Sequence, residues 1–72
     1  MMIKIDENYI DRFKKSGNEY LFYIINGIYL AFDENKKYIG LESFYNISNK
    51  NYLTLENRAL NQLYKLGWIY DI

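Results

Sequence analysis

Hydrophobic and polar positions follow a strand-like pattern in the middle of this 72-residue chain. Every residue from Tyr20 to Phe32 is apolar or aromatic except the pair Asn26-Gly27. Asn-Gly between two apolar runs predicts a tight β-hairpin, because both turn residues need a positive φ, which Gly adopts freely and Asn tolerates. A second turn, "DENKK", leads into "YIGLES". We therefore predict a three-stranded antiparallel β-meander.

A two-residue loop in the first hairpin pairs Ile25 with Ile28, and alternation then divides the meander into two faces. The first face is mainly aliphatic and contains Leu21, Tyr23, Ile25, Ile28, Leu30, Phe32, Ile39 and Leu41. The second face is mainly aromatic and contains Tyr20, Phe22, Ile24, Tyr29, Ala31, Asp33, Tyr38, Gly40 and Glu42. Neither face has the polar residues expected of a solvated sheet surface, so each face is expected to need a cover.

The segment "IDENYIDRFKKSGN", residues 5–18, predicts a first helix. Asp6 is suited to the N-cap, and Gly17 is suited to a left-handed stop. The apolar stripe of this helix consists of Tyr9, Ile10 and Phe13, which is narrow, so the helix must dock on another element.

A second helix, "LENRALNQLYKLG", is predicted after a polar connector at residues 44–51, which carries the aromatic residues Phe44 and Tyr45. Thr54 is the expected N-cap and Gly67 the expected stop, with Trp68 folding back on the last turn. Its wide apolar surface consists of Leu55, Ala59, Leu60, Leu63, Tyr64 and Leu66.

The predicted fold is a single small α+β domain spanning residues 1–72, with the antiparallel three-stranded β-meander flanked by an N-terminal and a C-terminal helix. The β-prone end segments "MIKI" and "WIYDI" are expected to pair with each other or with a sheet edge. The C-terminal helix is expected to cover the aliphatic face and the N-terminal helix the aromatic one.

Three apolar residues cover little of an aromatic sheet face, so part of that face is expected to bind a partner. The candidate anchors are Tyr20, Phe22, Tyr29 and Tyr38, around a low floor formed by the cross-strand neighbours Ala31 and Gly40. Tyrosine suits interfaces because it combines a large contact area with few rotatable bonds. Three alternatives remain open for this face: a cover from the same chain, a base-stacking platform for single-stranded nucleic acid, and a homodimer interface.

Composition excludes several kinds of chemistry. The chain has no Cys and no His, so disulfides and the usual zinc sites are ruled out, and no cofactor or metal is expected. Catalytic motifs are also missing from the sequence, and its clustered carboxylates are explained by turns and helix starts, so we do not expect an enzyme.

The net charge and the apolar runs of the sequence limit the classes of partner and the compartment that we expect. Nine acidic and nine basic residues give a formal net charge of zero, which disfavours a general nucleic-acid binder. The sequence shows no secretory signal and no apolar run of membrane-spanning length, so we expect a cytoplasmic protein without a membrane partner.

Ile, Asn, Lys and Tyr make up almost half of the residues and use AT-rich codons, a bias associated with phage and mobile-element genes of AT-rich bacteria. We therefore expect a small protein–protein interaction module, a phage or mobile-element inhibitor that sterically blocks a host defence protein such as a CRISPR nuclease, as anti-CRISPR proteins do. The alternative is a nucleic-acid-binding protein that uses the aromatic sheet face or the C-terminal helix, where Arg58, Asn61, Gln62 and Lys65 could serve.

Overall fold

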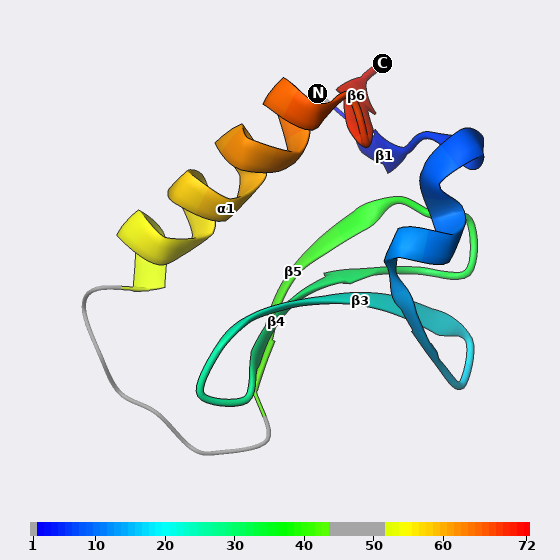
Figure 1. The fold of residues 1–72 in the computed structure, drawn as a ribbon. Helices are drawn as coiled ribbons and strands as arrows, with labels where there is room; N and C mark the ends of the chain where they lie inside the picture. Colours follow the sequence, from blue (N-terminus) through cyan, green and yellow to red (C-terminus); the bar gives the residue numbers. More distant parts are fainter. Residues whose placement is uncertain (1, 44–51) are drawn as a thin grey trace.

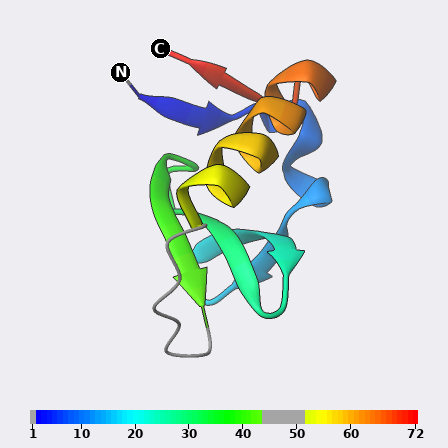
Figure 2. The ribbon, with the colours of Figure 1, turned by 90° about the vertical axis from the view of Figure 1, so that its left-hand side faces the viewer.

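The computed structural model describes residues 2–43 and 52–72, which form a sheet, a helix laid across one side of it, and a ribbon made from the two chain ends (Figures 1 and 2). In chain order the elements are β1 (Ile3–Ile5), the 3-10 helix η1 (Glu7–Arg12), β2 (Lys14–Ser16), β3 (Glu19–Ile25), β4 (Ile28–Phe32), β5 (Tyr38–Ser43), α1 (Tyr52–Leu66) and β6 (Ile69–Asp71). Strands β2 to β5 form a four-stranded antiparallel sheet in sequence order, and β1 pairs antiparallel with β6. The α+β class and the C-terminal helix are confirmed, whereas the predicted connector with Phe44 and Tyr45 lies outside the described residues.

The predicted tight hairpin joins β3 to β4. Asn26 has φ 50° and Gly27 has φ 74°, the positive values that the type I′ turn requires, and Ile25 pairs with Ile28 as predicted. The next pair, however, is Tyr23 with Tyr29, because Ile24 is an extra residue in a β-bulge. Every β3 residue before the bulge therefore faces a partner one position away from the predicted one.

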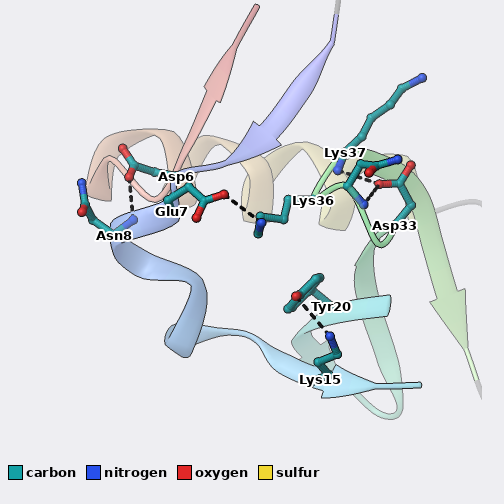
Figure 3. A network of polar contacts seen from close by, with 9 residues as sticks. Asp6, Glu7, Asn8, Lys15, Tyr20, Asp33, Lys36 and Lys37 are labelled. Carbon is teal, nitrogen blue, oxygen red and sulfur yellow. Dashed lines mark hydrogen bonds and ion pairs between the residues drawn. The ribbon is translucent and has the colours of Figure 1, made fainter. Parts of the chain in front are cut away.

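The turn "DENKK" between β4 and β5 is held by one carboxylate. The Asp33 side chain accepts hydrogen bonds from the backbone N–H of Asn35 at 2.8 Å and of Lys37 at 3.0 Å (Figure 3). Lys36 takes the left-handed conformation, with φ 68°. A second bulge follows at Ile39, between the pairs Phe32–Tyr38 and Ala31–Gly40.

The predicted first helix is wrong over most of its length. Asp6 caps as predicted, with its carboxylate accepting from Asn8 N at 2.9 Å, but the helical part is the short η1, which is interrupted at Tyr9 by φ −120°. Residues 14–16 instead form β2, and Gly17, with φ 60°, begins the two-residue turn into β3. A short helix with a three-residue apolar stripe is marginal on its own, whereas pairing with the edge of β3 joins residues 14–16 to the sheet and leaves Phe13 buried in the core.

The C-terminal helix α1 begins at Tyr52, so Thr54 lies in its first turn and is not the predicted N-cap. Its end is as predicted. Gly67 has φ 76° and donates its N–H to Tyr64 O, while Trp68 donates to Leu63 O, each at 3.0 Å, the two bonds of a Schellman stop.

The two ends of the chain pair with each other, which confirms one of the two expected arrangements. Strand β1 lies against β6, with Ile5 opposite Ile69, and Figure 2 shows both termini on the same side of the molecule. Backbone hydrogen bonds from Ile5 N to Lys36 O at 3.0 Å and from Asp6 N to Trp68 O at 2.8 Å attach this ribbon to the β4–β5 turn and to the end of α1.

The core lies between α1, the terminal ribbon and one face of the sheet. Leu30, Phe32 and Leu63 have no exposed surface at all. The full buried cluster consists of Ile5, Phe13, Leu30, Phe32, Ala59, Leu60, Leu63 and Ile69. The helix therefore covers one side of the sheet, and the other side is the surface to consider next.

Candidate interaction surface

The strand register assigns each side chain of the sheet to one of two faces, because direct cross-strand partners point to the same side. On the side of α1 the rows are Tyr20–Phe32–Tyr38 and Phe22–Leu30–Leu41. On the opposite side, called the outer face here, the rows are Lys14–Leu21–Ala31–Gly40 and Tyr23–Tyr29–Glu42. Both faces mix aliphatic and aromatic residues, so the predicted aliphatic and aromatic faces are wrong.

The four predicted anchors do not lie together. Tyr20, Phe22 and Tyr38 are on the side of α1 and pack against the core, whereas Tyr29 is on the outer face. Two bulges cause this separation. The bulge at Ile24 shifts the register of β3 by one residue, and the bulge at Ile39 places Tyr38 opposite Phe32, on the side of α1. A partner-binding role for these residues stays a prediction, but they cannot act as one patch. The predicted floor pair, Ala31 and Gly40, is confirmed as a cross-strand pair.

Tyr38 is tied to α1 by its hydroxyl group, which donates a hydrogen bond to the Glu56 carboxylate. Burial of the ring, followed by this hydrogen bond and the negative charge of Glu56, raises the pKa of Tyr38 well above its usual range. The contact uses the single carboxylate of α1, so the exposed side of the helix carries no acid.

Tyr20 lies at the edge of the core and is covered by a lysine from β2. Lys15 Nζ is 3.3 Å from Tyr20 Oη, to which it donates, and 4.8 Å from the ring centroid (Figure 3). Lys36 Nζ lies 2.8 Å from Glu7 Oε1, in an ion pair that links the β4–β5 turn to η1 (Figure 3). In both contacts a lysine side chain lies at the edge of the core and pairs with a neighbouring polar group.

The outer face carries two large apolar side chains that are about half exposed. Tyr23 is 56% exposed and Ile39, in the second bulge, is 51% exposed. Tyr23 is held in place, because its ring meets that of Tyr29 at a centroid distance of 5.4 Å and its hydroxyl accepts a hydrogen bond from Asn26 N at 3.0 Å. The surface therefore presents a fixed aromatic ring.

Between these side chains the outer face has a low floor. Leu21 and Ala31 are buried, and Gly40 follows them in the same row. A Cβ placed on Gly40 would meet no other heavy atom within 4 Å, so the space above this residue is open. The open space above Gly40 could take a side chain from another molecule.

Two acidic residues border the same face. Glu19 lies two residues before Leu21 in β3 and so points to the same side, and Glu42 is the cross-strand neighbour of Tyr29. A hydrogen bond with the Glu19 carboxyl, followed by burial and the charge of Glu19, raises the pKa of Glu42. The carboxyl groups of Glu19 and Glu42 therefore meet over the outer face, and the basic residue Lys14 lies on the same face beside Leu21.

A hollow of about 190 Å³ lies between the start of α1, the start of β4 and the end of β5, lined by Ile28, Leu41, Glu42, Ser43 and Tyr52. The Tyr52 hydroxyl is buried there and has no hydrogen-bond partner in the part of the chain that the structure describes. Among residues 2–43 and 52–72, no group of three or more potential ligands is placed to hold a metal ion.

The residues that distinguish the outer face, Tyr23 and Ile39, were assigned by sequence to the aliphatic face together with core residues. One signal was available: a glycine inside a strand often marks a bulge, and Gly40 directly follows the bulged Ile39. The bulge at Ile24 has no such marker in the sequence.

Comparisons with known proteins assign no family or function to this chain. Neither the family models, nor the curated proteins, nor the solved structures include a match to this chain. In the described residues, no helix combines the length and the apolar character needed to cross a membrane.

Proposed function

We propose that this protein is a protein-binding module that docks a partner on the outer face of its sheet. The observation that carries the proposal is the presence of two half-exposed apolar side chains, Tyr23 and Ile39, on the face that α1 does not cover, beside the open space above Gly40. Exposed apolar side chains on one surface are typical of interaction sites, and a tyrosine held by neighbouring groups loses little entropy on binding.

The chemistry of this face favours a protein partner with an apolar side chain and a neighbouring basic one. The apolar group would fill the space above Gly40, and the basic group would meet the paired carboxyl groups of Glu19 and Glu42. The same carboxyl groups repel phosphates, which argues against a nucleic acid at this surface. Steric blocking of a host defence protein, suggested by base composition, stays a prediction, since the surface supports docking alone.

A photo-crosslinking amino acid placed at one residue at a time tests this proposal in cells that express the gene. The reactive side chain replaces Tyr23 in one variant and Tyr70, an exposed tyrosine on the terminal ribbon, in the control variant. We expect a crosslinked adduct with one other protein from position 23 and none from position 70. The additional substitution Ile39→Ser should reduce the yield of this adduct severalfold.

Two results would contradict the proposal. An adduct that forms equally from both positions would show that the outer face has no special role. An adduct with twice the mass of the chain from position 23 would make the outer face a homodimer interface, and its function would have to lie on another surface.

A further inference from the structure

The exposed side of α1 presents a continuous row of polar side chains, called the polar stripe here. It consists of Thr54, Arg58, Asn61, Gln62 and Lys65, which line a hollow of about 530 Å³. The spacings of three and four residues place them on one side of the helix, away from Ala59, Leu60 and Leu63 in the core. Figure 1 shows that only one side of α1 is turned toward the sheet.

The charges of the polar stripe are all positive and are not neutralised within the described residues. Arg58 and Lys65 are exposed, and neither forms an ion pair with any residue in 2–43 or 52–72. Glu56, the one carboxylate of α1, is held on the core side by Tyr38. The positive end of the helix dipole lies near Thr54 and adds to the same potential.

We infer that the polar stripe binds the phosphate backbone of a nucleic acid. Arginine and lysine bind phosphate by charge, and the hydroxyl and amide groups of the same stripe can donate to phosphate oxygens or contact base edges. Arg58 and Lys65 are seven residues apart, about 10 Å along the helix, which is enough to reach two phosphates of one strand. The polar stripe and the outer face thus differ in charge, so they would bind different classes of ligand.

Fluorescence anisotropy with the full chain tests this inference directly. The probes are a labelled 20-base-pair DNA duplex and the corresponding single strand, each titrated between 20 and 200 mM KCl. Two phosphate contacts predict a logarithmic salt slope of about −1.8 for the duplex, which corresponds to a loss of affinity of about 60-fold across this range. Absence of binding to both probes at 20 mM KCl would overturn the inference.

A pair of matched double variants locates the site. Arg58→Gln with Lys65→Gln removes both charges from the polar stripe, and Lys4→Gln with Lys37→Gln removes two charges where β1 meets the β4–β5 turn. We expect the first variant to lose at least tenfold in affinity at 20 mM KCl and the second to lose less than threefold. Circular dichroism checks that both remain folded. Equal losses of affinity in the two variants would show that DNA binds elsewhere on the protein. If a polyglutamate peptide competes as well as DNA, the ligand of the polar stripe is an acidic protein and not a nucleic acid.

Discussion

At the scale of the residue, Tyr38 shows how a polar group is accommodated under α1. Its ring packs against that of Phe32 at a centroid distance of 5.2 Å, and its hydroxyl reaches Glu56. An uncharged hydroxyl that donates to a carboxylate costs little to bury, whereas a phenolate beside that carboxylate would be strongly destabilised.

This arrangement predicts a loss of stability at alkaline pH. Above about pH 10, the ordinary tyrosine value, Tyr38 ionises in the unfolded chain while the folded protein keeps its proton, so the free energy of unfolding falls as pH rises. Burial and its hydrogen bond with Asp71 raise the pKa of Tyr64 to about 12, which contributes in the same direction between pH 10 and 12.

Urea denaturation at pH 8, 9, 10 and 11 measures this effect. Tyr38→Phe should show a clearly smaller decline above pH 10 than the unsubstituted protein, and Tyr70→Phe, at an exposed position, should show the full decline. The assignment to Tyr38 fails if its Phe variant declines as steeply as the control.

Single residues are also where sequence reasoning succeeds best. Asp6, Asn26, Gly27 and Gly67 adopt the predicted roles, because each role depends on the backbone within a few residues. The contact between Tyr38 and Glu56 could not be predicted in this way, since it depends on how α1 is placed relative to β5.

At the scale of the element, bulges set the strand register and edge pairing sets the extent of the sheet, and the local sequence pattern predicts neither. One extra residue at Ile24 moves Tyr20 and Phe22 relative to Tyr29, although the turn and its first pair were predicted. The residues of β2 have the composition of a helix end, with Lys14 and Lys15 before Gly17, but they pair with β3 instead. Pairing between segments outweighs weak local preference, and a single sequence does not contain that information.

The end of α1 gives a prediction at this scale. Gly67→Ala should lower the free energy of unfolding by about 1 kcal/mol, because alanine is disfavoured at positive φ. A Cβ at this position meets no other heavy atom within 4 Å, so the loss comes from backbone conformation and not from a clash.

Chemical denaturation checks the value, with Asn57→Ala as the control at an exposed position inside α1. We expect the control to change stability by less than about 0.5 kcal/mol. An unchanged stability in the Gly67 variant would mean that the Schellman stop does not hold the end of the helix.

At the scale of the whole molecule, the two sides of one sheet differ in how they are covered. The side under α1 and the terminal ribbon contains the core, and the outer face combines Tyr23 and Ile39 with a glycine floor. Sequence reasoning predicted that the apolar side chains of the sheet exceed what the helices can cover. It could not predict which of them remain exposed, because that depends on two bulges and on the position of β2.

The most direct test of this division compares two adjacent residues of β3, Phe22 and Tyr23. Phe22 is partly buried and packs against the core, whereas Tyr23 lies on the outer face. In urea denaturation, Phe22→Ala should lower the free energy of unfolding by about 3 kcal/mol, as expected for an aromatic residue removed from a core. Tyr23→Ala should lower it by about 1 kcal/mol or less, as expected for an exposed position. Equal losses in the two variants, or a larger loss for Tyr23→Ala, would contradict the assignment of the outer face as the free docking surface.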